Sequence, residues 1–150
     1  MCAMPSFRFT VYATPISQPR QRHRVLQLPG RKPVSVNYTP TGDPVNLYKT
    51  YLREAALKKM GTMPPLEGAI GLVLRFYLQR PKKYDSPKFN TGAIRHIGNK
   101  DLDNLYKAVA DAFIGVVYRN DGQIAGCLME KFYTEKDGRP RVEIEVKYDD

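Results

Sequence analysis

The sequence has little of the chemistry that cysteine, histidine and tryptophan provide. It contains 2 cysteines and 2 histidines among 150 residues, and no tryptophan. Two cysteines are too few for a disulfide framework, and no histidine and cysteine cluster with zinc-ligand spacing accompanies them, so a structural zinc site is not expected. The two histidines, His23 and His96, are far apart in the sequence. Nothing around them suggests nucleophilic catalysis by serine or cysteine.

Long apolar runs are absent as well. No stretch approaches the roughly 18 consecutive apolar residues of a membrane span, and residues 1–10 lack the charged start and apolar run of a signal peptide. We therefore expect a cytoplasmic protein with no membrane partner. A length of 150 residues with 42% hydrophobic and 26% charged residues is typical of one compact domain, which we expect to span residues 1–150.

Acidic residues are in the minority. The chain has 15 Asp and Glu against 24 Lys and Arg, a formal net charge of +9. This excess favours polyanionic partners, nucleic acid first and an acidic membrane surface second, over a basic protein with no anionic partner. Residues 15–33 are predicted to form an exposed basic loop, in which Arg20, Arg22 and Arg24 contact phosphates if the partner is nucleic acid and are merely solvated if it is not.

The spacing of apolar residues predicts three strands and two helices in the first three quarters of the chain. Alternation predicts short strands at residues 7–11 and 34–38, and residues 70–78, apolar on both faces, predict a long central strand. Helical spacing predicts a helix over residues 45–60, with Tyr48 and Leu52 in the core. A second helix is predicted by the buried-face residues Leu102, Leu105, Tyr106, Val109 and Phe113.

The remaining segments complete an α+β prediction. Residues 79–100 read as a mobile basic loop, in which His96 is expected to be exposed, and Phe89 and Ile94 either wedge into DNA or pack on their own sheet. Residues 123–133 and the strand that ends at Tyr148 are predicted to form a C-terminal β-hairpin. The fold class expected is therefore α+β, a single domain with a mixed β-sheet and two main helices.

The densest group of polar residues surrounds the start of the second helix. If Asp101 is the last extended residue and Asp103 caps the helix, both carboxylates point to one side, beyond the helix N-terminus. Lys107, one turn along, can lean back toward them. Carboxylate oxygens suit Mg²⁺, for which Mn²⁺ can substitute, rather than zinc.

Carboxylates in a nucleic-acid-binding surface repel phosphates unless a cation lies between them. The group of carboxylates around the second helix therefore indicates a metal site. Such metals activate water and stabilise the leaving oxygen, while Lys107 would stabilise charge on the phosphorus oxygens. The alternative is structural. Asp103 is a good helix cap in any protein, Asp103 and Lys107 could form an ordinary surface pair, and residues 120–122 are a common turn sequence.

The pattern from Asp101 to Ile124 resembles the signature of RusA-type Holliday junction resolvases, which are common in bacteria and in their phages and prophages. A looser match covers residues 7–22 and 38–40. The residues that carry the resemblance are Asp101-Leu102-Asp103-Asn104-Leu105, then Lys107, Asp111 and Gly115, then Asn120-Asp121-Gly122-Gln123-Ile124.

The resemblance implies a dimeric, Mg²⁺-dependent endonuclease. The metal-binding carboxylates of that family match Asp101, Asp103 and Asp121, and its catalytic lysine matches Lys107. Two departures stand out: Asn120 occupies a position where many members have aspartate, and Lys100 stands where many have a proline before the first aspartate. Lys100 and Lys107, with the arginines of the basic loop, are expected to contact DNA.

The resulting hypothesis is an endodeoxyribonuclease that resolves four-way DNA junctions in recombination and repair. Because a four-way junction has approximate two-fold symmetry and must be cut on two opposed strands, a homodimer with one site per subunit is expected. Two alternatives stay open: a non-catalytic nucleic-acid-binding protein, and a nuclease with a looser structure preference that acts on flaps or single strands.

Overall fold

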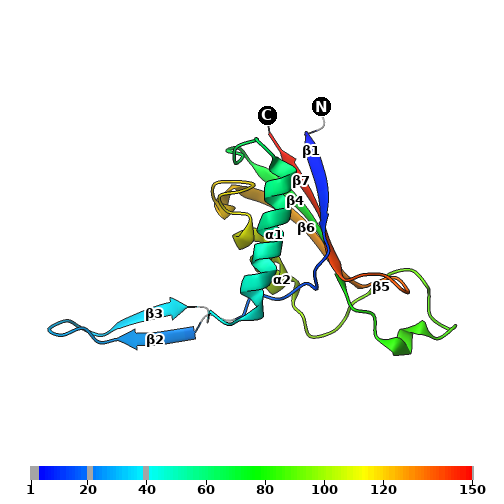
Figure 1. Ribbon diagram of the computed structural model, residues 1–150, viewed down its shortest axis with the longest axis horizontal. Coiled ribbons are helices and arrows are strands. Elements are labelled where there is room, and N and C mark those ends of the chain that lie inside the picture. The colour runs from blue at the N-terminus through cyan, green and yellow to red at the C-terminus, as the bar shows by residue number, and fades with distance from the viewer. Residues whose placement is uncertain (1–3, 20–21, 39–40, 150) are drawn as a thin grey trace.

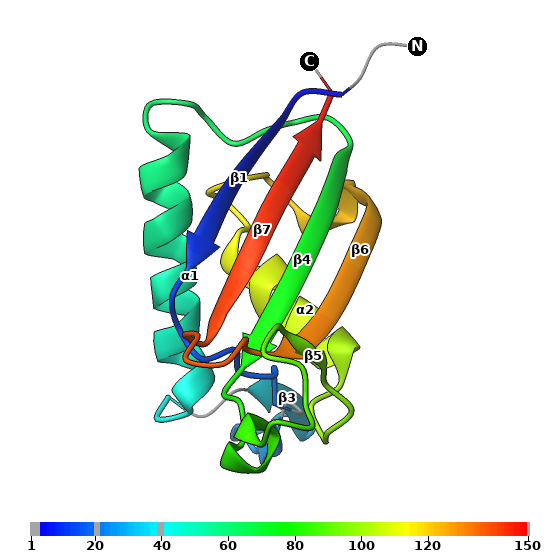
Figure 2. The same ribbon diagram turned by 90° about the vertical axis from the view of Figure 1, so that its right-hand side faces the viewer.

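A five-stranded mixed sheet forms the centre of the computed structural model, which describes residues 4–19, 22–38 and 41–149. The strands lie in the order β1-β7-β4-β6-β5, and two helices cover one face, as Figure 2 shows. This arrangement confirms the α+β class with a mixed sheet and two main helices. The bounds are β1 Ser6–Val11, α1 Pro44–Met60, β4 Ile70–Leu78, β5 Ile94–Arg95, α2 Leu102–Ala112, β6 Ile124–Tyr133 and β7 Arg141–Tyr148.

Strand β4 lies in the middle of the sheet because both of its edges are paired. It is parallel to β6 on one side and antiparallel to β7 on the other. Parallel strands need a crossover, and here the connection between β4 and β6 contains α2. The register aligns Leu72, Leu74 and Phe76 with Val146, Ile144 and Val142, and all six side chains are buried under the helices.

Helix α1 begins and ends where its sequence predicts. The Asp43 carboxylate accepts a hydrogen bond from the Val45 amide at 3.0 Å, and Pro44 occupies the first turn. Gly61, with φ of 59°, ends the helix in a left-handed conformation that suits glycine. Tyr48 and Leu52 are buried, which confirms them as core residues. No helix in the described part of the chain is long and apolar enough to cross a membrane.

The predicted C-terminal β-hairpin is wrong. Strands β6 and β7 run in opposite directions, but β4 lies between them and pairs with both. The turn is real, because the Gly138 amide donates to the Glu135 carbonyl at 2.9 Å and Asp137 has φ of 63°. The turn residues determine only that the chain reverses its direction locally. They do not determine whether the two strands pair with each other or lie on either side of a third strand.

The basic loop predicted for residues 15–33 contains a strand that the sequence pattern missed. β2, Arg22–Leu26, pairs antiparallel with β3, Val34–Tyr38, in a separate two-stranded sheet. Figure 1 shows this hairpin projecting from the body of the molecule. The strand escaped prediction because apolar and basic residues alternate irregularly and no core lies behind it. We call this hairpin, residues 22–38, the arm.

Residues 79–100 are more ordered than a mobile loop. Arg80 is buried and donates to the carbonyl oxygens of Tyr84, Asn90 and Gly92. A short 3₁₀ helix, η1 (Lys82–Asp85), lies within the segment, and the Tyr84 and Phe89 rings meet edge to face at 4.9 Å. Phe89 therefore packs within its own segment, and Ile94 lies on β5, paired with Tyr133 of β6. Insertion of either side chain into DNA stays a prediction.

The buried side of β4 should carry much of the stability. Replacing Leu74, which has no exposed surface, with alanine should lower the free energy of unfolding by about 2–5 kcal/mol, because it removes packed methyl groups and leaves a cavity. Leu128 is 55% exposed on β6, and Leu128→Ala should change the same quantity by about 0.5 kcal/mol or less. Urea unfolding measures both, and equal effects would contradict the assignment of the core.

Candidate active site

The start of α2 presents three of the four predicted catalytic side chains to solvent. Asp101 is the N-cap residue, with φ of −74° and ψ of 135°, and its side chain makes no capping hydrogen bond. Asp103 lies in the first turn and Lys107 one turn later, and all three are exposed. The prediction that Asp103 caps the helix is wrong by two residues. Asp101 occupies the cap because the chain is extended there and helical from Leu102 onward.

The opposite side of α2 holds the helix in place. Leu105 and Val109 are fully buried, and the Tyr118 hydroxyl donates to the Ala110 carbonyl at 2.6 Å. At the C-terminal end, the Arg53 guanidinium donates to the carbonyl oxygens of Ala112 and Ile114, at 3.2 and 3.3 Å. A cation there also complements the negative end of the helix dipole. The exposed face that carries Asp103 and Lys107 therefore rests on a fixed helix.

Asp121, the fourth residue, begins the 3₁₀ helix η2 (Asp121–Gln123), which is built by its neighbours. The Asn120 side-chain oxygen accepts from the Gly122 amide at 2.8 Å, and the Gln123 oxygen accepts from the Asn120 amide at 2.9 Å. The Gln123 amide group donates to the Leu66 carbonyl at 2.8 Å. Asn120 thus has a structural role as a cap. The turn is held by side chains other than that of Asp121, whose carboxylate stays exposed.

The Asp121 carboxylate acts electrostatically on one side chain of α2. Burial raises the pKa of the Tyr106 phenol, and Cys127 and the carboxylates of Asp121 and Asp111 raise it further. Tyr106 lies on α2, so both carboxylates are within electrostatic range of that helix. Among residues 4–19, 22–38 and 41–149, however, no three His, Cys, Asp or Glu side chains are grouped so that they could hold a metal ion. The set Asp101, Asp103 and Asp121 therefore stays a prediction.

The chemistry of these side chains fits a hard divalent cation. In the part of the chain that the structure describes, no hydrogen bond or ion pair uses the carboxylate of Asp101, Asp103 or Asp121. Mg²⁺ binds through a few carboxylates and keeps several waters, so exposed carboxylates without structural duties suit it. The surface pair considered for Asp103 and Lys107 does not form; instead Lys49 contacts Asp111 at 3.6 Å.

The chain that leads into Asp101 is held by two residues whose roles the sequence reading missed. The Lys131 ammonium, on β6, donates to the carbonyl oxygens of Gly98 at 3.2 Å and Lys100 at 2.6 Å. His96 was expected to be exposed, which is wrong: it is 9% exposed, and its Nδ1 accepts from the Gly98 amide at 3.0 Å. Burial lowers the pKa of His96, and the charge on Lys131 lowers it further.

One sequence signal could have identified Lys131. It follows Met129 in the alternation of β6 and pairs with Phe76, a core residue, so it lies on the face covered by the helices. A lysine on that face needs acceptors, and the carbonyl oxygens before Asp101 supply them.

The predicted DNA-contacting residues fall into two regions. Arg22 and Arg24 lie on β2 of the arm, whereas Arg20 lies outside the described residues. Lys100 and Lys107 flank the start of α2. The two regions approach each other at Gln18, whose backbone amide donates to the backbone carbonyl of Asn104 at 2.9 Å. The chain therefore passes beside α2 shortly before it enters the arm.

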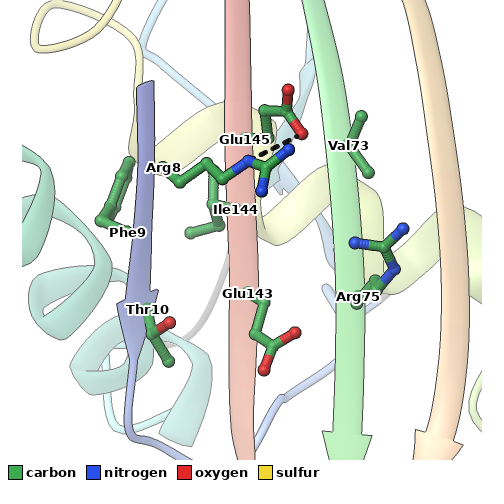
Figure 3. Close-up of a pocket in the computed structure, with 8 residues that line it drawn as sticks. All are labelled: Arg8, Phe9, Thr10, Val73, Arg75, Glu143, Ile144 and Glu145. Atoms are coloured by element: carbon green, nitrogen blue, oxygen red, sulfur yellow. Dashed lines mark ion pairs between the residues drawn. The ribbon is translucent and has the colours of Figure 1, made fainter. Parts of the chain in front are cut away.

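A separate hollow of about 300 Å³ lies on the uncovered face of the sheet. As Figure 3 shows, Arg8, Arg75, Glu143 and Glu145 surround it. Arg8 pairs with Glu145 at 3.2 Å, and Arg75 pairs with Glu130 at 3.4 Å. The charges of this face largely neutralise one another, and the face lies on the other side of the sheet from α2.

Comparison with known proteins identifies relatives over nearly the whole chain. The model of the family described as Endodeoxyribonuclease RusA matches residues 13–147. The chain is also 27% identical over 151 aligned residues to a Bacillus subtilis (strain 168) protein named "Uncharacterized protein YqaN", covering 96% of this chain and 97% of that protein. The matched region includes α2, η2 and the loop that Lys131 anchors.

The anchoring of that loop can be measured directly. Lys131→Met removes both hydrogen bonds to the backbone while keeping a side chain of similar length. We expect faster hydrogen exchange of the amides of residues 97–101, since the local opening free energy falls. Lys147→Met, at an exposed position on β7, is the matched control and should leave their exchange unchanged. Equal exchange in the two variants would show that Lys131 does not hold the loop.

Proposed function

The chain belongs to the Endodeoxyribonuclease RusA family, which indicates endodeoxyribonuclease activity, and on that premise we propose that it resolves four-way DNA junctions by Mg²⁺-dependent hydrolysis of phosphodiester bonds. The observation that carries the proposal is the presence of exposed carboxylates, Asp101 and Asp103 at the start of α2 and Asp121 in η2, that make no hydrogen bond or ion pair within the described residues. We expect this work to take place in the cytoplasm, during recombination and repair of DNA, including that of phages or prophages.

Each side chain has a distinct task in this proposal. Asp101, Asp103 and Asp121 would hold the metal, which supplies an activated water and stabilises the leaving oxygen when it is bound. Lys107 lies one turn into α2, where its ammonium can offset negative charge that develops on the phosphate. Lys131 and His96 keep the chain before Asp101 in place. The free amides at the start of α2 favour a phosphate group there.

The basic residues would supply affinity rather than chemistry. Lys100, Arg22 and Arg24 are proposed phosphate contacts, together with Arg20. Such contacts position DNA without reading its sequence. Junction recognition would then depend on the shape of the DNA and on the placement of two sites. We therefore also propose a homodimer with one site per subunit, since paired incision requires two.

Removing the carboxylate charge should separate binding from cleavage. Asp103→Asn or Asp121→Asn keeps the side-chain shape but weakens metal binding, so cleavage of a four-way junction in Mg²⁺ should be abolished while binding in EDTA is retained. Lys107→Ala should lose orders of magnitude in rate with unchanged circular dichroism. Gel assays of nicked product give the rates.

A matched control lies on the same exposed face of α2. Asp111→Asn removes a carboxylate that pairs with Lys49 and that is not a proposed ligand, and it should keep most of the activity. Cleavage near the wild-type rate in both Asp103→Asn and Asp121→Asn would overturn the metal-site assignment and favour a non-catalytic binding protein. Equal cleavage of junctions, flaps and linear duplex would favour a nuclease of looser preference.

The dimer is tested by sedimentation equilibrium at micromolar concentration. For the free protein, we expect a mass of about twice the 17.1 kDa of one chain. The complex with a junction should also contain two subunits. A monomer both free and bound would rule out paired incision by a single dimer.

A further inference from the structure

The arm is a formed element whose described side chains are largely exposed. Every residue from His23 to Ser35 is exposed, and Figure 1 shows the two strands standing apart from the sheet and helices. A two-stranded hairpin is at best marginally stable in water. A partner that covers the exposed side chains of the arm would therefore stabilise it.

The tip of the arm is locally ordered. The Arg31 amide donates to the Leu28 carbonyl at 3.1 Å across Pro29 and Gly30, and Gly30 has φ of 71°. Proline followed by a glycine with positive φ is typical of a type II turn. The Gln27 side chain adds a hydrogen bond to the Arg31 carbonyl at 3.1 Å. The turn therefore holds Leu28 and Arg31 at a defined end of the arm.

The surface of the arm combines positive charge with apolar side chains. Residues 22–38 contain four Lys and Arg and no Asp or Glu. Val25 is 67% exposed, Leu28 49% and Val34 53%. The register pairs Leu26 with Val34 and Arg24 with Val36, so apolar and basic residues share one face.

This chemistry favours DNA over a second copy of the chain as the partner. The arm carries four Lys and Arg and no Asp or Glu, so the arms of two copies would repel each other, whereas the phosphates of DNA attract the arm. A two-stranded ribbon fits a DNA groove, and proteins that bend or open DNA combine basic residues with apolar side chains inserted between bases.

The arm is also long enough to lie along several base pairs of DNA, and it begins near the candidate active site. Seven residues from Arg22 to Leu28 span roughly 23 Å at about 3.3 Å per residue, which is about six or seven base-pair steps of duplex at 3.4 Å each. The chain enters the arm just after Gln18, which is bonded to α2. DNA held at the candidate active site would thus lie within reach of the arm.

We propose that the arm is a DNA-binding β-ribbon that lies in a groove of one duplex of the junction and places its apolar tip, Leu28 and Pro29, against unstacked bases at the branch point. The identity of the DNA rests on the proposed function, whereas the binding role of the arm does not require cleavage. Arg31 and Lys32 contact phosphates beside the tip.

The charge of the arm is tested by binding in EDTA, where no cleavage occurs. In Arg31→Gln/Lys32→Gln, affinity for a fluorescent four-way junction should fall several-fold, and the slope of log affinity against log salt should decrease by about one to two, since each phosphate contact contributes about 0.9. The control, Lys58→Gln/Lys59→Gln, makes the same change of charge at exposed residues in the last turn of α1, and should change the slope less. Equal slopes for the two double variants would overturn the proposal.

The apolar tip is tested with 2-aminopurine at the branch point. Wild-type protein should increase its fluorescence by unstacking it, and Leu28→Ala should reduce that increase at saturating protein. Leu57→Ala, which changes a leucine that is 55% exposed on α1, should not. An unchanged signal in Leu28→Ala, or a loss of dimer in the arm variants that accounts for their weaker binding, would overturn the proposed role.

These results are independent of the catalytic proposal. Arm-dependent binding without Mg²⁺-dependent cleavage by the wild-type protein would support the arm and refute the proposed function. Normal binding by the arm variants, with wild-type cleavage, would refute the arm and leave the proposed function intact.

Discussion

Pairing of β4 along both of its edges is the constraint on which the rest of the structure depends. Because β4 is parallel to β6, the chain between them must cross the sheet, and α2 forms part of that crossover. The apolar face of α2 is buried against the sheet, so its polar face must point outward. The exposed positions of Asp103 and Lys107 follow from strand pairing rather than from any attraction between the two residues.

The polar elements around α2 are held mainly by neutral or positively charged groups. Lys131 and His96 hold the loop before Asp101, Gln123 and Asn120 hold the turn that contains Asp121, and Arg53 holds the far end of α2. The carboxylates themselves have no such task among the described residues. This division matters physically, because a carboxylate already neutralised by an arginine or lysine is a poor metal ligand. It also explains how a basic protein can keep acidic side chains unpaired on its surface.

The two faces of the sheet differ in their electrostatics. One is covered by the helices and is mainly apolar, with Lys131 as an exception, whereas the other is exposed and carries arginine–glutamate pairs such as Arg8 with Glu145. The net positive charge of the chain is consequently concentrated elsewhere, including the arm, where no acidic residue balances it. Charge distribution within the fold, more than the total of +9, indicates where a polyanion would bind.

The sequence by itself determined the α+β class, α1 with its Asp43 cap, and the burial of Tyr48 and Leu52, because these depend on local spacing and on capping chemistry. The order Asp101, Asp103 and Lys107 likewise placed those side chains near one helix end. Only the tertiary structure decided that β4 separates β6 from β7, that residues 22–38 form an arm, and that His96 is buried. These features depend on contacts that local patterns do not encode: a turn motif cannot specify which strand its neighbours pair with, and a histidine in a polar segment shows no sign of Lys131 and Tyr133 on β6, which it contacts.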